Sequence, residues 1–363
     1  MINVLILIHN LRVANGVASF AMNYFRDLDQ SEIHVDFALY ANRPSPYYDE
    51  IRMRGSDIYI LPKVSDIKEH LKKCNEILSA KKYDIVHDNT LHISIPMMFC
   101  AKKKNIPVRI LHSHNTKMGE TSQKELRNKM ILPVLRSLAT DYVACSQLAG
   151  EAMFGKRKFT VIPNVIQTKK YRFDPAVRER VRQDMNVQDK LIVGTVGRLA
   201  EQKNPFFAVD VFTHLLKDLP DAEYWWIGSG PLQEQVKDYV EEKSLSDRVK
   251  LLGSRNDVLE LYQGMDAFLL PSLFEGLPLT GVEAQAMGLP MVVSNTVTDE
   301  MVYTDLVDYV DLNAPMAVWV EHLKEALRRN ADRAKYADVL RRSAFSNVDC
   351  GKNLMDMYKK MLG

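Results

Sequence analysis

Residues 267–293 read AFLLPSLFEGLPLTGVEAQAMGLPMVV, and this stretch contains the pattern that decides the fold. Its first four residues, 267–270, have the length and composition of a buried strand. Residues 280–287 have the composition of a short helix that ends at Gly288, and a second apolar run follows at 291–293. A strand, a helix and a second strand in this order predict one unit of a parallel α/β sheet.

The same alternation of strand-like and helix-like segments continues along the whole chain, in two series. A chain of 363 residues is long enough for two domains, each with its own apolar core. We therefore expect an α/β protein of two doubly wound domains, with ligands bound at the carboxyl ends of the strands, in a cleft between the domains. The strand-like runs are residues 4–8, 35–40, 58–61, 85–87, 108–111, 142–144 and 160–162 in the first series, and 191–195, 222–227, 249–252, 267–270 and 291–293 in the second.

Shifts in composition mark the expected domain boundaries. We predict a first domain over residues 1–170 and a second over 191–346, joined by a linker over 171–190 that is dense in charge and contains a polar helix. Residues 347–363 have apolar side chains at roughly helical spacing. We expect a helix there, which can pack back on the first domain.

Charge is divided unevenly, although the net charge is only +2. Residues 1–182 hold 29 Lys and Arg against 18 Asp and Glu, whereas residues 183–363 hold 19 against 28. A basic half suits an anionic partner such as a phosphorylated substrate or an acidic membrane surface. Nucleic acid is not expected as a partner, because neither an RNP-like aromatic pattern nor a helix-turn-helix signal accompanies the lysines.

Cysteine usage and hydropathy bear on the compartment. The four cysteines form no C-x-x-C pair, so we expect no zinc ribbon, iron–sulfur cluster or disulfide scaffold. The apolar residues 1–8 are too few to cross a bilayer, and no later run approaches the ~18 apolar residues of a membrane span. We expect a cytoplasmic protein.

Two carboxylates flank the start of the predicted helix. Glu275 lies in the loop before it, and Glu283 follows eight residues later within the helix. Pro278 has no amide hydrogen, and the amides of Leu279 and Thr280 have no partner inside the helix, so the helix start can bind an anion. Both carboxylates can face a ligand held there, although a loop carboxylate and a solvated helix residue would give the same pattern.

A loop with two cations follows the predicted strand at 191–195. It contains Gly197, Arg198 and Lys203 and leads into another predicted helix. Two cations five residues apart in such a turn suit a diphosphate, because Arg can bind two oxygens and Lys acts as a point charge. The alternative is a pair of surface cations on a loop.

Weaker signals lie in the first half of the chain. Gly16 follows the first strand, where glycine allows either a close backbone approach or a positive φ. His112 and His114 end another predicted strand, where they could bind a metal or be ordinary hydrogen-bonded histidines at the rim of the cleft. The Asp-Leu-Asp at 27–29 is interpreted as a solvated helix end, and the dinucleotide fingerprint G-x-G-x-x-G is absent.

Together these segments resemble the retaining glycosyltransferases of family 4, which have the GT-B fold. The E-x7-E motif of that family is matched by Glu275 through Glu283, and its G-R-x4-K motif by Gly197, Arg198 and Lys203. The resemblance implies two Rossmann-like domains that face a central cleft. Further segments that fit the family, or its EpsF-like capsular and exopolysaccharide branch, are residues 112–115, 144–146, 161–164, 228–231, 252–258 and 298–300.

The resemblance also implies roles for individual residues. Arg198 and Lys203 would hold the diphosphate of a nucleotide sugar and stabilise the leaving group. Glu283 would bind the ribose hydroxyls and Glu275 the donor hexose. The remaining implied contacts are the amides of Leu279 and Thr280 at the phosphate, Arg255 and Asn256 at the base, Gly16 near the diphosphate, and Gly197, Gly230 and Gly276 along the donor.

Two positions in the first domain stay open. The family has a histidine near the donor sugar, and both His112 and His114 fit that place. The family also has a pair of glycines in the first loop, and Asn15 stands at the first of these two positions, before Gly16.

The implied function is transfer of a hexose or N-acetylhexosamine, with UDP as the expected nucleotide, to a glycan or a polyprenyl-pyrophosphate-linked acceptor in bacterial capsule or exopolysaccharide synthesis. No cofactor and no metal ion are implied. A nucleotide-sugar 2-epimerase and a non-catalytic nucleotide-sugar-binding subunit are the alternatives. Residues 123–138 form a basic amphipathic segment, which predicts peripheral attachment to the anionic inner membrane surface unless its apolar side packs into the domain.

Overall fold

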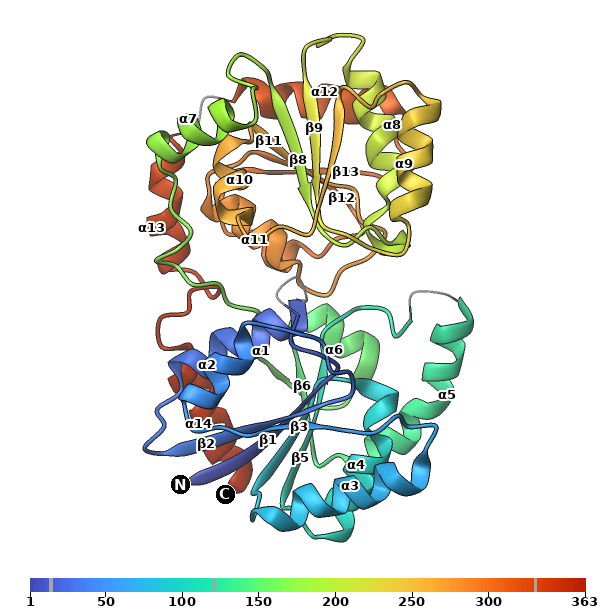
Figure 1. Ribbon diagram of the computed structural model, residues 1–363, viewed down its shortest axis with the longest axis vertical. Coiled ribbons are helices and arrows are strands. Elements are labelled where there is room, and N and C mark those ends of the chain that lie inside the picture. Colours follow the sequence, from blue (N-terminus) through green and yellow to red (C-terminus); the bar gives the residue numbers. More distant parts are fainter. Residues whose placement is uncertain (13–15, 120–121, 330–331) are drawn as a thin grey trace. The chain divides into compact units, whose positions relative to one another are not determined.

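The computed structural model describes residues 1–12, 16–119, 122–329 and 332–363, which form two compact units. The first unit consists of Met1–Val165 and Asn347–Gly363, and the second of Ile166–Ser346 (Figure 1). Each unit contains one parallel sheet with helices on it. The fold class is therefore α/β with two Rossmann-like domains.

The sheet of the first unit has seven strands in its described residues, in the order β3-β2-β1-β4-β5-β6-β7. Successive strands run outward from β1 in both directions, so the order reverses between β1 and β4. In doubly wound sheets, ligands bind at the carboxyl ends of the strands beside such a reversal. The strands are β1 (Ile2–Ile8), β2 (Ile33–Leu39), β3 (Ile58–Ile60), β4 (Ile85–Asp88), β5 (Val108–Ser113), β6 (Asp141–Ala144) and β7 (Thr160–Val161).

Both faces of this sheet are covered, as the alternating side chains of β1 illustrate. Val4 and Ile6 pack into one apolar cluster with α1 and α14, whereas Leu5 and Leu7 pack into another with α3 and α4. Because successive side chains of a strand point to opposite faces, an unbroken apolar run is what a parallel sheet buried on both faces requires. The helices are α1 (Gly16–Asp27), α2 (Tyr47–Met53), α3 (Ile67–Ala80), the 3-10 turn η1 (Leu91–Ser94), α4 (Ile95–Lys103), α5 (Ser122–Leu138), α6 (Gln147–Phe154) and α14 (Cys350–Leu362).

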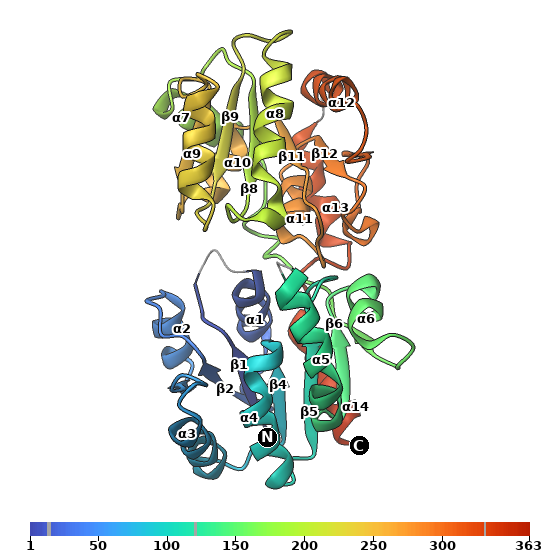
Figure 2. The same ribbon diagram turned by 90° about the vertical axis from the view of Figure 1, so that its right-hand side faces the viewer.

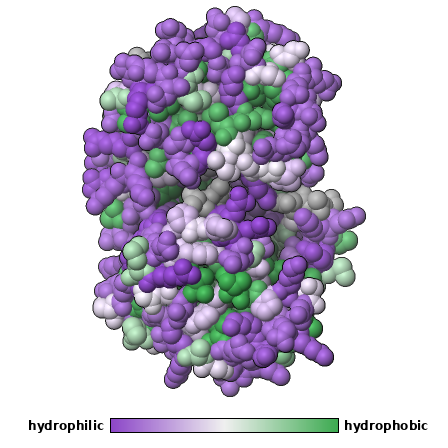
Figure 3. Space-filling view, in the orientation of Figure 1, coloured by the Kyte–Doolittle hydropathy of each residue, from purple (hydrophilic) through white to green (hydrophobic). Residues whose placement is uncertain are grey.

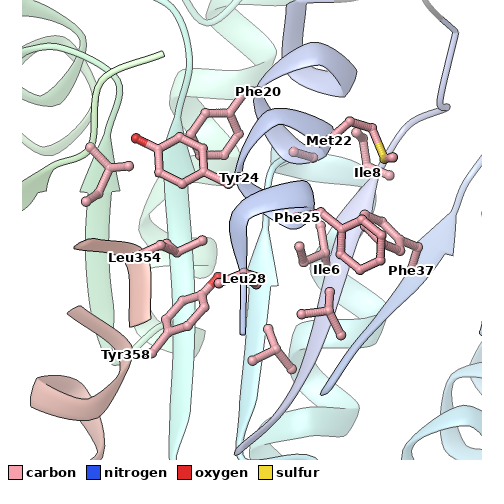
Figure 4. Close-up of a cluster of buried hydrophobic side chains, with 14 of the residues drawn as sticks. Ile6, Ile8, Phe20, Met22, Tyr24, Phe25, Leu28, Phe37, Leu354 and Tyr358 are labelled. Atoms are coloured by element: carbon pink, nitrogen blue, oxygen red, sulfur yellow. The ribbon is translucent and has the colours of Figure 1, made fainter. Parts of the chain in front are cut away.

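Helix α14 lies beside α1 in the first unit, although 322 residues separate the two helices along the chain. Leu354 and Tyr358 of α14 are buried in the same cluster as Tyr24 and Phe25 of α1 (Figure 4). A Cβ at Gly351 would lie 2.1 Å from the carbonyl oxygen of Asp27, so the close approach of the helices requires glycine there.

The prediction that Asp27 and Asp29 lie at a solvated helix end is confirmed, since Asp27 is the last residue of α1 and both residues are exposed. Asp27 Oδ2 accepts a hydrogen bond of 2.8 Å from the Gly351 amide in the first turn of α14. A carboxylate at that place interacts favourably with the positive end of the helix dipole. Asp27 thus joins two helices, and Asp29 accepts from its near neighbour Ser31.

The sheet of the second unit has six strands in the described part of the chain, in the order β10-β9-β8-β11-β12-β13. Here the order reverses between β8 and β11. Apolar residues of α8, α9 and α12 pack into one cluster with the strands (Figure 2). The strands are β8 (Ile192–Val196), β9 (Glu223–Ile227), β10 (Val249–Gly253), β11 (Ala267–Leu270), β12 (Met291–Ser294) and β13 (Val307–Val310).

The helices of the second unit include one that was predicted to belong to a linker. They are α7 (Pro175–Asp184), η2 (Glu201–Lys203), α8 (Pro205–Leu215), α9 (Gln233–Glu242), α10 (Val258–Gly264), α11 (Leu279–Ala286), η3 (Asp299–Met301), α12 (Met316–Arg328), η4 (Arg333–Lys335) and α13 (Tyr336–Arg341).

Helix α7 packs on α10, so residues 171–190 are part of the second unit and not a separate linker. Arg178 and Arg182 of α7 bind the two carboxylate oxygens of Asp266 at 2.5 and 3.1 Å. Both also donate to the carbonyl of Gly264 at the end of α10. The charged residues that suggested a solvated linker are thus donors to the carbonyls of a helix end, where cations are favourable.

Candidate active site

The predicted site residues of the second unit lie in four loops that follow neighbouring parallel strands. Arg198 follows β8, Gly230 follows β9, Arg255 follows β10 and Glu275 follows β11. Because the strands are parallel and adjacent, all four loops lie at the carboxyl edge of the sheet. The structure therefore gathers these residues at the edge where ligands bind in doubly wound sheets.

A buried ion pair lies at the centre of this edge. Lys203 Nζ is 2.6 Å from Glu275 Oε1, and both side chains are largely buried. Gln202 Nε2 donates to Glu275 Oε2 at 3.1 Å, so both carboxylate oxygens have partners. The pair joins η2 to the loop before α11, and a backbone hydrogen bond from Leu273 to Gln202 joins the same two segments.

The glycines of these loops allow close backbone packing. A Cβ at Gly197 would lie 3.1 Å from Cε of Lys203, so glycine there leaves room for the lysine side chain. A Cβ at Gly228 would lie 2.1 Å from the Gly197 carbonyl oxygen, and one at Gly230 would lie 2.1 Å from that of Leu199. The loops after β8 and β9 are thus packed backbone to backbone, and the adjoining Arg198 is exposed.

The start of α11 presents hydrogen-bond donors that no described residue of the protein accepts from. The carbonyl of Pro278 accepts from the amides of Gly281 and Val282 at 3.0 and 3.2 Å, which begins the helix. The amides of Leu279 and Thr280 have no acceptor in the part of the chain that the structure describes. In addition, the Thr280 hydroxyl is buried and has no hydrogen-bond partner among the described residues. Two such amides and such a hydroxyl at a helix start are the donors that an anion could use.

Glu283, on α11, is held by two tyrosines. Its Oε1 accepts from the Tyr171 hydroxyl at 2.6 Å and its Oε2 from the Tyr262 hydroxyl at 3.0 Å. Burial raises the pKa of Glu283, and the two tyrosine hydrogen bonds oppose that shift. Glu283 is therefore oriented rather than solvated.

Arg255 and Asn256 lie in an exposed turn after β10. Arg255 is bound by both carboxylate oxygens of Asp257, at 2.8 and 2.5 Å. This pairing fixes the guanidinium at the edge of the site and leaves the role of Arg255 at a nucleotide base a prediction.

The predicted residues of the first unit lie at the carboxyl edge of its own sheet. His112 is buried at the end of β5, and the half-buried His114 follows it. Their rings stack with centroids 4.0 Å apart. Both line a cavity of about 170 Å³, together with Asn89, Thr90 and other residues of the loops around it.

Gly16 is the first residue of α1 and is exposed. Of the two roles considered for Gly16, its place at the start of a helix favours a close backbone approach over a positive φ. A Cβ there would meet nothing within 4 Å, so only an approach by a ligand would require glycine. The preceding residue, Asn15, lies outside the described residues.

Several residues of the site were not predicted. Gln202, Tyr171 and Tyr262 all bind one of the two glutamates. Gln202 is adjacent to Lys203 in the predicted loop and could have been proposed as a site residue on that ground. Tyr262 lies in an apolar helix, and no sequence motif marks it as a site residue. Within the described ranges, no group of three His, Cys, Asp or Glu side chains is placed to hold a metal ion.

Comparison with protein families covers both units. A family model described as "Glycosyltransferase Family 4" matches residues 14–170, and one described as "Glycosyl transferases group 1" matches residues 177–337. The matches therefore cover the candidate sites of both units.

Individual proteins are similar over most of their length. The EpsF protein of Bacillus subtilis, which is named as a glycosyltransferase, is 29% identical over 324 residues, covering 86% of this chain and 84% of that protein. An Escherichia coli UDP-Gal:α-D-GlcNAc-diphosphoundecaprenol α-1,3-galactosyltransferase is 27% identical over 300 residues, which cover 77% of this chain and 76% of that protein. The crystal structure of Anabaena HepE with UDP-glucose has a TM-score of 0.82 at 17% identity, and the match covers 99% of this chain and 100% of HepE. The two proteins therefore share the fold.

Proposed function

Because the chain belongs to the glycosyltransferases, with the group 1 and family 4 regions just described and the GT-B fold, we propose that it transfers a hexosyl or N-acetylhexosaminyl group from a UDP-sugar with retention of configuration. The acceptor is a glycan or a polyprenyl-pyrophosphate-linked glycan, in capsule or exopolysaccharide synthesis. The observation that carries the proposal is the group formed by Arg198, the Lys203–Glu275 pair and the free amides of α11 at one sheet edge.

This arrangement suits the departure of a nucleoside diphosphate. As the bond between the sugar and the phosphate breaks, negative charge grows on the terminal phosphate. Arg198, Lys203 and the first amides of α11 are donors that can stabilise this charge. Glu283 would accept hydrogen bonds from ribose hydroxyls and Glu275 from hydroxyls of the hexose. In the proposed retaining reaction the acceptor attacks on the face from which the nucleoside diphosphate departs, and the departing phosphate oxygen takes the proton of the acceptor hydroxyl, so the chain need supply no covalent nucleophile.

The comparisons support the choice of substrate. Three HepE structures contain UDP and glucose, UDP-glucose, and UDP, respectively. The Escherichia coli relative is named for UDP-Gal and for a diphosphoundecaprenol-linked acceptor, and a Staphylococcus aureus relative, CapH, is named for capsular polysaccharide biosynthesis. Neither the 2-epimerase nor the non-catalytic alternative has comparable support.

A donor panel tests the proposal. The protein is mixed with UDP-GlcNAc, UDP-Glc, UDP-Gal, UDP-GalNAc or GDP-Man, and both nucleotide release and equilibrium binding are measured. We expect one UDP-sugar to bind and to be turned over faster when a lipid-linked acceptor is added, with the α anomer in the product of an α-linked donor. Binding of none of these donors, or conversion of the donor to its C2 epimer, would contradict the proposal.

Activity is expected to persist in EDTA. The reason is that two cationic side chains and the amides of α11 are available to take the place of a metal ion at the diphosphate. Turnover is measured before and after treatment with EDTA, and again after addition of Mg²⁺ or Mn²⁺. Full loss on chelation that either ion restores would show that a metal stabilises the leaving group.

The proposal includes peripheral attachment to an anionic membrane through α5. Its apolar residues divide into two sets: Leu132, Leu135 and Leu138 are buried, whereas others remain at the surface. Packing into the domain, the alternative to membrane attachment, therefore buries only three of these apolar residues. Among the described residues, no helix has both the length and the apolar character to cross a bilayer.

The exposed set forms one stripe of α5. Leu126, Met130 and Val134 are 63%, 73% and 49% exposed and follow each other at intervals of four residues, so they share one side of the helix. Apolar side chains interrupt the hydrophilic surface at the edge of the first unit where α5 lies (Figure 3). Lys124 and Lys129 flank the stripe. An apolar stripe beside cations is the arrangement of helices that lie on anionic lipid surfaces.

Vesicle sedimentation tests the attachment. We expect salt-sensitive binding to anionic vesicles that is lost in L126S/M130S/V134S and weakened in K124E/K129E, since each cation contributes ~1 kcal/mol near such a surface. L148S, which replaces an exposed leucine of α6, serves as the control. Equal binding to neutral and anionic vesicles, or wild-type binding by the triple variant, would rule out this mode of attachment.

A further inference from the structure

The Lys203–Glu275 ion pair joins two groups to which the proposed function gives different partners. Lys203 Nζ is 2.6 Å from Glu275 Oε1, whereas the proposed function gives the ammonium to the diphosphate and the carboxylate to the hexose. Only 13% of the lysine side chain and 7% of the glutamate side chain are exposed. A phosphate that binds this ammonium therefore meets a largely buried carboxylate that already holds it.

A second anion at the ammonium is unfavourable while the carboxylate stays in contact with it. Two negative groups on one cation repel each other, and this repulsion is strong where water is largely excluded. A diphosphate carries more negative charge than a single carboxylate, so it is the stronger partner for the cation. We therefore expect Lys203 to change its partner when a diphosphate binds, rather than to hold both anions.

The backbone that bears Lys203 is held by hydrogen bonds, so a change of partner requires only a movement of the side chain. Lys203 lies in the 3-10 turn η2, where its amide donates to the Ala200 carbonyl at 3.0 Å. Its side chain passes close to the end of β8, because a Cβ on Gly197 would lie 3.1 Å from its Cε. Arg198 directly follows Gly197. The lysine side chain thus runs beside the strand end from which the second cation extends.

Gln202 holds the loop of Glu275 independently of the lysine. Its Nε2 donates to Glu275 Oε2 and to the Phe274 carbonyl, both at 3.1 Å. Its own carbonyl accepts from the Leu273 amide at 2.8 Å. Gln202 therefore binds three consecutive residues of the loop, and its contact with Glu275 is to the oxygen on which Lys203 does not lie. A neutral amide has no net charge through which a phosphate could draw it away.

We propose that Lys203 leaves Glu275 for the diphosphate when a nucleotide binds, and that Gln202 is the positioning residue that keeps Glu275 in place during this exchange. The inference rests on the proposed function for the identity of the ligand. In the ligand-free protein Glu275 competes with the diphosphate for the cation, and so it weakens the binding of the nucleotide. Gln202 reduces this competition, because the carboxylate that loses the ammonium keeps one donor.

Removal of the carboxylate charge is expected to strengthen the binding of UDP. In E275Q the amide oxygen can still accept from Lys203, but a neutral acceptor forms a weaker hydrogen bond with an ammonium than a carboxylate does. We expect the Kd of UDP, measured by titration calorimetry, to fall ~5-fold or more, and the Kd of UMP, which lacks the second phosphate, to change much less. A Kd of UDP in E275Q that equals or exceeds that of the wild type would overturn the exchange.

A matched control is E223Q, which removes the charge of another buried glutamate of the second unit. Glu223 is 4% exposed and pairs with Lys190. It is the first residue of β9, so it lies at the amino end of the parallel strands, at the edge opposite the one that holds Arg198 and Glu275. We expect E223Q to be less stable, as the loss of one partner of an ion pair requires, and to keep the wild-type Kd of UDP. An equal gain of UDP affinity in E223Q would show an effect of net charge alone and would contradict the exchange.

Variants of Gln202 distinguish positioning from a merely structural role. Q202L removes the donor to Glu275, so release of Lys203 leaves the carboxylate with one partner fewer, and we expect the Kd of UDP to rise ~5-fold. In E275Q no carboxylate has to be held, so the added change Q202L should leave the Kd of E275Q almost unchanged. A merely structural defect in η2 would raise the Kd by the same factor in both backgrounds, and that result would refute the role of Gln202.

A crystal structure of the complex with UDP shows the exchange directly. We expect Lys203 Nζ within hydrogen-bond distance of a phosphate oxygen and outside that distance from Glu275 Oε1, with Gln202 Nε2 still bound to Glu275 Oε2. An ammonium that still contacts Glu275 Oε1 in the complex would overturn the inference.

The outcomes distinguish this inference from the proposed function. If the wild-type protein transfers a sugar but E275Q gains no affinity for UDP, the exchange is wrong and the proposed function stands. If no UDP-sugar is turned over, the proposed function fails, whereas the Kd of UDP in the wild type and in E275Q still tests the exchange. Should UDP not bind, inorganic pyrophosphate takes its place in the same titrations, and failure of both to bind would overturn the inference.

Discussion

Replacement of Arg198 by alanine is expected to lower turnover by ~10²-fold or more, because in the proposed function Arg198 is a donor that stabilises charge in the transition state. Arg198 directly follows Gly197 at the end of β8 and is exposed at the sheet edge where the Lys203–Glu275 pair lies. Loss of an exposed loop side chain has little effect on stability. The variant should therefore fold normally and fail mainly in kcat, which single-turnover release of UDP would measure.

A matched control is R180A, which removes another exposed arginine of the second unit, one that is bound to Glu260 on the surface. We expect R180A to keep wild-type turnover. A rise in KM at constant kcat for R198A would mean that Arg198 only binds the donor. Near-normal turnover would show that Arg198 does not meet the leaving group.

The second large effect concerns the Lys203–Glu275 pair, in which both side chains are largely buried. Removal of one partner of a buried ion pair leaves an uncompensated charge, which costs about 3–5 kcal/mol. We therefore expect K203M to unfold at clearly lower urea concentration than the wild type and to lose turnover. The urea concentration at the midpoint of unfolding measures the loss of stability, and the release of UDP measures the loss of turnover.

The double variant K203M/E275L separates stability from catalysis. Replacement of both charges by apolar side chains of similar volume removes the desolvation cost of each, so most of the lost stability should return. Turnover should stay low, because the double variant lacks both the cation proposed to bind the phosphate and the carboxylate proposed to bind the hexose. A double variant that is as unstable as K203M, or one that regains activity, would contradict this account of the pair.

The fold could be predicted from the sequence because it depends on local patterns. The apolar runs at β1 and β8 are unbroken, as strands buried on both faces require. Strand β13, in which Val307 and Asp308 are only half-buried, lacks such a run and was missed. The α7 segment was misjudged because its arginines find their partners in Asp266 and in carbonyls more than 80 residues away.

In the candidate site, too, local motifs could be recognised in the sequence, whereas contacts between residues far apart in the chain could not. The resemblance of the segments around Lys203, Glu275 and Glu283 to local family motifs predicts that they bind a nucleotide sugar, and this role stays a prediction. That Lys203 pairs with Glu275 across 72 residues could not be predicted, because the contact depends on how η2 meets the loop before α11.

The position of α14 has a consequence for the order in which the protein is made. The ribosome completes the whole second unit, Ile166–Ser346, before it synthesises Asn347–Gly363. Until then the face of α1 that receives Leu354 and Tyr358 stays open to solvent. Domains generally fold as units during synthesis. The second unit can therefore be fully folded while the first unit still lacks helix α14. Synthesis of the first unit thus begins before that of the second unit and ends after it. During that interval the nascent chain exposes an apolar face of α1, to which a chaperone could bind.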